Sequence, residues 1–132
     1  MKIEFQLDIP TFSINKKHCR DQRYVTAEYK DWSTKIQYLL DDVKLLTDLA
    51  LQFKAQGGVF SLELHAVYPG SVYYTKDRNI SSKVHDLSNW EKVLCDELFN
   101  RMDVNDKFIT RLTSTKRAGS HHYIEIKMQL LR

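Results

Sequence analysis

Two aspartates and a lysine in the second half of the chain have the types and spacing of a site that hydrolyses phosphodiesters. Asp86 precedes a predicted helix, Lys92 lies inside it, and Asp106 follows it. Carboxylate oxygens and water are the ligands that Mg²⁺ prefers, and a helix N-terminus attracts phosphate. In such a site the metal would activate water and offset the charge of the pentavalent phosphate, while the lysine would stabilise the phosphate or the leaving oxygen. We expect the three side chains to converge at this helix N-terminus.

Each of these residues also has an ordinary structural explanation. Asp86 is then a solvated loop acid, Lys92 pairs with Asp96 four residues later on the helix, and Asp106 caps a turn. Spacing alone leaves these alternatives open, so the elements that position the three residues matter.

In the first half of the chain the apolar residues change their period. Residues 2–9 alternate between apolar and polar, which predicts a half-buried strand that ends at Pro10. Over residues 26–56 the apolar positions are three and four apart, which predicts one long helix that ends at Gly57 and Gly58. The even spacing is also that of a coiled-coil seam, but the flanking strands favour a helix laid across its own sheet.

The second half contains three further strands and a shorter helix. Residues 60–66 alternate as a strand closed by Pro69 and Gly70, and residues 71–85 form a long polar connection of the kind that is usually functional. Ser88 and Glu91 have the form of a capping box at the start of a helix that ends near Asn100. Residues 107–113 and 122–130 then predict two strands joined by a hairpin around residues 118–120. The order β-α-β-α-β-β predicts a single α+β domain over residues 1–132, with a mixed sheet and two helices.

Length and composition exclude several classes of protein. The chain has 132 residues, of which 42% are hydrophobic and 28% charged, so it is neither disordered nor of low complexity. No segment has the roughly 18 uninterrupted apolar residues that a membrane span needs, and the N-terminus alternates where a signal peptide would be apolar. We expect a cytoplasmic protein without membrane contact. Cys19 and Cys95 have no metal or redox spacing and are interpreted as buried or inert thiols.

The distribution of charge is more informative than its total. The chain has 20 Lys+Arg and 17 Asp+Glu, a net charge of +3 that is too small for a protein that coats nucleic acid without preference. The basic residues gather in three stretches, at residues 16–23, 76–83 and 116–122, whereas many acids lie in the first helix. This pattern is consistent with two arrangements. In the first the three stretches form one positive face of the folded chain, and in the second they are three separate solvated loops. For the first case we predict a DNA-binding surface made of Asn15, Lys16, Lys17, Arg20, Arg23, Lys83 and Lys116.

Two tyrosines in the long polar connection are candidates for base stacking. Tyr73 and Tyr74 are aromatic residues in a segment that also contains basic residues. Exposed loop tyrosines are common, so an ordinary surface role is the alternative.

Ordered motifs over nearly the whole chain resemble those of the RusA-type Holliday-junction resolvases of bacteria and their phages. Residues 13–16, Ser-Ile-Asn-Lys, resemble the family's loop after the first strand, and residues 23–28 lead into the long helix as in the family. Residues 86–92, Asp-Leu-Ser-Asn-Trp-Glu-Lys, resemble its Asp-x-Asp-Asn-x-x-Lys helix start, which is the most specific match. Asn105 and Asp106 resemble the acidic pair after that helix, and Lys116 the lysine of the closing hairpin.

The resemblance implies a homodimeric, Mg²⁺-dependent endonuclease that binds four-way DNA junctions and nicks strands of like polarity, with Mn²⁺ as an alternative metal. It implies that Asp86 and Asp106 bind the metal and that Lys92 is the catalytic lysine. Ser88 occupies the third metal position, where the family has its middle aspartate.

Ser88 departs from the family's motif in a way that affects the chemistry. A neutral hydroxyl is a weak ligand and brings no charge to offset a cation. Either the site is completed differently, with Asn89, Glu91 or Asp96 nearby, or it is inactive and the fold is retained for binding branched DNA. The two hypotheses are therefore a structure-selective endonuclease and a non-catalytic junction-binding protein of the same fold.

Overall fold

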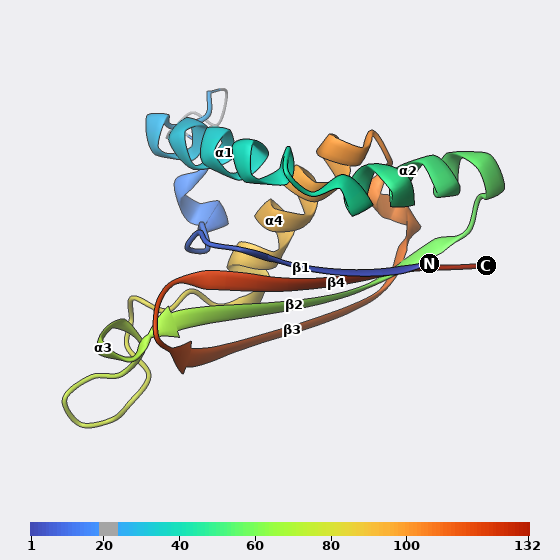
Figure 1. Cartoon of the computed structure of the whole chain (residues 1–132). Helices are drawn as coiled ribbons and strands as arrows, with labels where there is room; N and C mark the ends of the chain where they lie inside the picture. Colours follow the sequence, from blue (N-terminus) through green and yellow to red (C-terminus); the bar gives the residue numbers. More distant parts are fainter. Residues whose placement is uncertain (19–23) are drawn as a thin grey trace.

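One four-stranded sheet carries all the long helices on one of its faces, and its other face is free of helices (Figure 1). The computed structural model describes residues 1–18 and 24–132. The elements in chain order are β1 (Lys2–Leu7), η1 (Ile14–Lys16), α1 (Ala27–Leu40), α2 (Lys44–Gln56), β2 (Val59–Pro69), α3 (Gly70–Tyr73), α4 (Leu87–Met102), η2 (Asp106–Phe108), β3 (Ile109–Gly119) and β4 (Tyr123–Leu131). The predicted mixed α+β fold is confirmed.

The order of the strands across the sheet differs from their order in the chain. The sheet runs β1-β4-β2-β3, in which β4 is antiparallel to β1 and β2, while β2 and β3 are parallel. The predicted hairpin between the last two strands is therefore wrong, because β3 and β4 lie on opposite sides of β2. At the crossing Gly119 lies against Val67, where a Cβ atom on the glycine would come 2.4 Å from the Val67 Cγ1. The crossing thus depends on a residue without a side chain.

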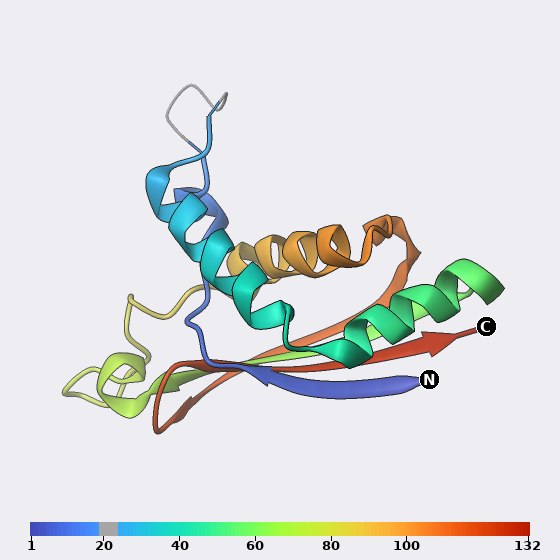
Figure 2. The same ribbon diagram turned by 45° about the horizontal axis from the view of Figure 1, so that its top comes forward.

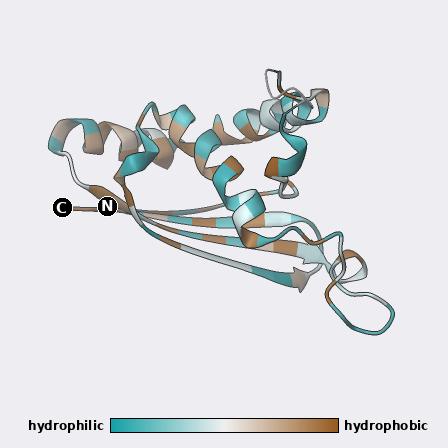
Figure 3. Ribbon diagram, turned by 180° about the vertical axis from the view of Figure 1, so that it is seen from behind, coloured by the Kyte–Doolittle hydropathy of each residue, from teal (hydrophilic) through white to brown (hydrophobic). Residues whose placement is uncertain are grey.

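The core lies between the sheet and the helices. Alternate residues of the two central strands are buried, among them Leu62 and Leu64 of β2 and Ile124 and Ile126 of β4. Brown and teal segments alternate along the strands in Figure 3, as the period of two requires. From the helices the core receives Trp32, Ile36, Leu46, Leu49, Trp90, Leu94 and Leu98.

The predicted single long helix is two helices that meet at an angle (Figure 2). The helical hydrogen bonds give way to tighter ones between α1 and α2, where the Asp42 amide donates to Leu39 and the Val43 amide to Leu40. Aspartate has low helix propensity, and a negative charge is unfavourable at a helix C-terminus. Asp41 pairs instead with Arg101 of α4, so the break directs both helices over the sheet.

A buried carboxylate joins α4 to α1. Glu97 of α4 is only 4% exposed and accepts hydrogen bonds from Tyr29, Ser33 and Gln37 of α1. Burial, followed by the hydrogen bond to Glu97, raises the pKa of Tyr29. Because a buried carboxylate is costly without such donors, this contact holds α4 at a defined position against α1.

The remaining boundaries are close to those predicted. β2 extends beyond the predicted strand at both ends, whereas β3 begins two residues later than predicted, after η2, and ends six residues later. The polar connection contains the short helix α3. Among the described residues, no helix is long and apolar enough to cross a membrane.

Candidate functional site

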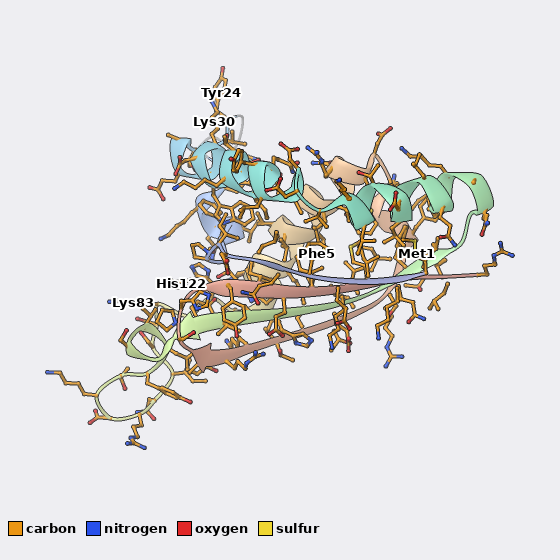
Figure 4. All side chains as sticks on the ribbon, viewed as in Figure 1. Met1, Phe5, Tyr24, Lys30, Lys83 and His122 are labelled. Carbon is orange, nitrogen blue, oxygen red and sulfur yellow. The ribbon has the colours of Figure 1, made fainter. Side chains whose placement is uncertain are left out.

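An open groove at the N-terminus of α4 brings together four segments of the chain. Its wall contains Asp86 and Asn89 from the start of α4, the segment before α4, the η1 turn, and Lys116 of β3. The groove has a volume of about 710 Å³. Its lining residues are Ser13, Asn15, Lys16, Ile80, Ser81, Ser82, Lys83, Val84, His85, Asp86, Asn89 and Lys116. Figure 4 places Lys83 at the end of the sheet where β2 and β3 finish.

Local structure positions the groove residues. Ser13 caps the η1 turn by accepting from the Asn15 amide at 3.2 Å, which orders the loop that carries Lys16. Asp86 is the N-cap residue of α4, but its side chain makes no capping hydrogen bond. Amide groups of the first turn of α4 are therefore free of a side-chain cap, and such groups bind anions.

The charges of the groove are largely unpaired. In the part of the chain that the structure describes, Asp86, Lys16 and Lys83 form no ion pair, and Lys116 donates from Nζ to the His85 carbonyl at 3.4 Å. Ammonium groups without a protein partner are available to phosphate oxygens. The Asp86 carboxylate is likewise available to a water molecule or a cation.

A closed set of hydrogen bonds orients His85 at the edge of the groove. The Thr11 hydroxyl lies 2.8 Å from His85 Nδ1 and 2.7 Å from the Tyr68 hydroxyl, and the His85 amide donates to Tyr68 at 3.3 Å. Burial, followed by the charges of Lys16 and His122, lowers the pKa of His85. When Thr11 donates to Nδ1, the neutral ring carries its proton on Nε2. In that tautomer Nε2 is a hydrogen-bond donor at the edge of the groove.

A second group of charges, which we call the Lys92 cluster, lies beside the groove and consists of Lys17, Lys92, Asp96 and Asp106. Lys92 Nζ lies 3.0 Å from Asp96 and 3.0 Å from Asp106, and Lys17 lies 3.7 Å from Asp96. Hydrogen bonds to Asp96 and then Asp106 raise the pKa of Lys92. Lys92 is therefore a protonated ammonium, suited to stabilising negative charge and unsuited to acting as a base.

One face of α4 connects the two regions. Successive spacings of three, three and four residues separate Asp86, Asn89, Lys92 and Asp96. This spacing places the four residues along one side of a helix. The hollow around Lys92 and Asp106 also contains Cys95. Burial raises the pKa of the Cys95 thiol to about 12, so Cys95 is an inert thiol as predicted, while Cys19 lies outside the described residues.

The capping box predicted at Ser88 is wrong. Ser88 is the second residue of α4, while the residue with extended backbone before the helix is Asp86, whose carbonyl accepts from the Asn89 amide at 3.0 Å. Glu91 does not turn back to the helix start and accepts from the Ser114 hydroxyl of β3 at 2.5 Å. The tertiary contact to β3 therefore takes the side chain that a capping box would use.

The residues predicted to bind Mg²⁺ lie in different surroundings. Asp86 lines the groove. Asp106 belongs to the Lys92 cluster, where its carboxylate forms an ion pair with the Lys92 ammonium. Ser88 is exposed and neutral. Within the described ranges, no group of three or more His, Cys, Asp or Glu residues is arranged to hold a metal ion. Because Mg²⁺ usually takes only one or two protein carboxylates together with water and phosphate, the metal site at Asp86 and Asp106 stays a prediction.

The structure separates the residues predicted to bind DNA. Asn15, Lys16, Lys83 and Lys116 line the groove together, whereas Lys17 belongs to the Lys92 cluster and also lies 4.9 Å above the Tyr29 ring. Arg20 and Arg23 lie outside the described residues.

His85 and Thr11 were not predicted as site residues. Thr11 is separated from Tyr68 by 57 positions and from His85 by 74, and no local pattern indicates such a contact.

The comparison with known families matches the region that contains both charged groups. The family model described as "Endodeoxyribonuclease RusA" matches residues 10–129, which include the groove and the Lys92 cluster. No curated protein matches the sequence significantly.

Proposed function

Because the chain belongs to the RusA family of endodeoxyribonucleases, we propose that it is a structure-selective endonuclease that resolves four-way (Holliday) or other branched DNA junctions. The observation that supports this most directly is the groove at the start of α4. There the Asp86 carboxylate lies among Lys16, Lys83 and Lys116, and none of these four groups forms an ion pair within the described residues. Such an arrangement suits a phosphodiester substrate, since the lysines attract the phosphate and the carboxylate faces it.

DNA binding rests on the groove lysines and the helix start. Lys16, Lys83 and Lys116 come from three different segments, so together they contact phosphates on more than one side of the groove. The first-turn amides of α4 add donors for one phosphate. We propose that this phosphate is the one cleaved, because it lies next to Asp86.

The chemical step divides between Asp86 and the lysines. A water oxygen attacks phosphorus, its proton passes to the Asp86 carboxylate, and one P–O bond of the diester breaks. The leaving oxygen takes a proton from solvent water, so the products are a phosphate end and a hydroxyl end. The lysines stabilise the negative charge of the pentavalent phosphate, which is the largest contribution that such cations make to catalysis. We assign the leaving oxygen to Lys92, which reaches the strand along the face of α4 that begins at Asp86.

The Mg²⁺ requirement and the homodimer are further parts of the proposal. Asp86 and Asp106 would hold the metal, which would supply activation of water and compensation of the phosphate charge. A pair of symmetric nicks requires two active centres at a fixed distance, and a two-fold dimer is the simplest way for a small chain to supply them. Sedimentation of the protein alone and with junction DNA tests the dimer, and a persistent monomer in both would contradict paired nicking.

Incubation of the purified protein with an end-labelled four-way junction tests the proposed function. We expect paired nicks in the presence of Mg²⁺ or Mn²⁺, no product with a chelator, and little product from a linear duplex of the same sequence. Tight binding without product under any metal would support the alternative. The proposal would be overturned if the protein showed no preference for the junction and gave no product.

The alternative is a non-catalytic protein that binds DNA junctions, and Ser88 is the observation that favours it. An aspartate at this position would add an anionic ligand and would also interact favourably with the N-terminus of α4. We expect Ser88→Asp to strengthen Mg²⁺ binding, measured by calorimetry, and to raise cleavage. Ser88→Asn, which is similar in size and uncharged, is the control. Equal Mg²⁺ affinity in the two variants would contradict a metal role for this position.

A further inference from the structure

The segment between α3 and α4 forms an ordered arm, residues 74–80, that projects past the end of the sheet (Figures 1 and 2). Tyr74 and Ile80 form an antiparallel bridge at its base. At its tip the Thr75 amide donates to the Asn79 carbonyl at 2.8 Å and the Arg78 amide to the Thr75 carbonyl at 3.0 Å. The arm is thus a small hairpin with its own hydrogen bonds.

The base of the arm is tied to the domain by a buried tyrosine. Tyr73 is 7% exposed, and its ring contacts those of Tyr68 and Tyr74 at centroid distances of 6.1 Å and 4.9 Å. Its hydroxyl donates to the Lys116 carbonyl at 3.4 Å. Tyr73 therefore cannot stack on a base, but it holds Tyr74 at a defined position relative to the groove.

The arm exposes an apolar pair between two hollows. Tyr74 is 47% exposed and Ile80 is 54% exposed, although opposite residues of a bridge lie close enough to pack on each other. Ile80 lines the groove that contains Asp86. Tyr74 lines a second hollow of about 720 Å³ on the arm, together with Lys76 and Arg78. The arm therefore contributes a wall to each hollow.

The chemistry of this surface fits unstacked bases flanked by phosphates. An exposed aromatic ring stacks on any base whose face is open, and apolar side chains can enter between base steps that are already disrupted. Lys76 and Arg78 outnumber Asp77 at the tip, so the arm is positive where a DNA backbone would pass. In continuous duplex DNA the base faces are covered, whereas at a branch point some are open.

From these observations we propose that the arm recognises the branch point of junction DNA, with Tyr74 stacked on an exposed base and Ile80 beside it at the entrance to the groove. This inference rests on the proposed function, because it concerns the same DNA. It assigns the selectivity for branched DNA to the arm, whereas the groove lysines contact phosphates that every DNA has.

A fluorescent base analogue at the branch point tests the proposal in the absence of cleavage. Full-length protein is titrated with chelator present into a four-way junction carrying 2-aminopurine next to the branch, and into a linear duplex with the same label. We expect a fluorescence change on binding only in the junction. Tyr74→Ala should remove that change and lower the junction-to-duplex affinity ratio about tenfold, the size of one stacking contact, while Tyr74→Phe should retain both.

The control is Tyr38→Ala, which removes a tyrosine that is 73% exposed on α1. It should leave the fluorescence change and the affinity ratio unchanged. Full retention of both by Tyr74→Ala, or an equal loss in Tyr38→Ala, would overturn the role of the arm. The proposed function is tested separately by the wild-type protein, because a junction preference with no dependence on Tyr74 contradicts only the arm.

Discussion

The groove and the Lys92 cluster lie on the same helix and contain the same kinds of side chain, but their charges are arranged differently. In the groove Asp86 and the lysines have no carboxylate–ammonium contact with one another among the described residues. In the cluster Lys92 contacts two carboxylates at 3.0 Å, and Asp96 is shared with Lys17.

The difference indicates which region meets a phosphate first. Unpaired lysines bind an anion without losing any existing contact. In the cluster, Lys92 must give up a carboxylate partner before it can bind a phosphate. Both partners of the Lys92–Asp106 pair are well exposed, since the Lys92 side chain is 54% exposed and that of Asp106 is 40% exposed. Pairs as exposed as this are worth only about 0–1 kcal/mol. Lys92 can therefore leave Asp106 at small cost, and its pairing is compatible with a role in catalysis.

The largest effect is expected from removing the Asp86 carboxylate of the groove. Asp86→Asn should lower the cleavage rate about 10²–10⁴-fold, the usual contribution of a positioned acid or base. Junction binding should stay equal or become tighter, because a repulsion with phosphate is lost. Single-turnover cleavage and a binding titration measure the two quantities. Asp48→Asn, at an exposed position of α2, is the matched control, and an active Asp86→Asn variant would exclude Asp86 from the chemistry.

Substitutions in the cluster should give a smaller loss. Lys92→Ala should reduce cleavage about 10²-fold, as expected when one stabilising cation is removed, with little change in affinity. Asp106→Asn should also lose cleavage with binding intact, if Asp106 acts as the resemblance implies. Lys35→Ala on α1, which removes an exposed i,i+4 pair with Asp31, controls for the loss of an ion pair. Normal cleavage by Lys92→Ala would leave only a structural role for the cluster.

Salt dependence separates the two regions more finely. Each lysine that contacts a phosphate contributes about 0.9 to the slope of log affinity against log salt. Lys16→Ala should therefore reduce the slope by about 0.9, whereas Lys17→Ala should reduce it less, because Lys17 is paired with Asp96. Affinities for one junction at several salt concentrations give both slopes. Equal reductions would show that the pairing of Lys17 does not persist on DNA.

The smallest effect is expected on folding stability, through His122 beside Tyr68. Burial, followed by the neighbouring His121, lowers the pKa of His122, so the unfolded chain binds this proton more readily than the folded chain. The free energy of unfolding should then rise with pH up to about 6.5. His122→Phe keeps a ring beside Tyr68, whose centroid lies 5.7 Å away, and should flatten the rise. Denaturant titrations between pH 5 and 7.5 test this, and identical slopes would refute it.

Much of the fold follows from local periodicity. The alternation in residues 2–9 predicts β1, and the helical spacing from Trp90 to Leu98 predicts α4, because both patterns come from neighbours a few positions apart. The long helix was overpredicted for the same reason. Its apolar stripe continues through Val43, and at the break Asp41 pairs with Arg101 of another helix.

The sequence by itself determined the candidate chemical groups, since the motif from Asp86 to Lys92 is a short stretch of one helix whose residues share a face. Only the tertiary structure decided which of those groups are paired and which are open. The insertion of β4 between β1 and β2, the contact of Thr11 with Tyr68 and His85, and the position of Ile80 of the arm in the groove all join distant parts of the chain. Such contacts depend on how whole elements pack, and no repeating pattern of neighbouring residues specifies them.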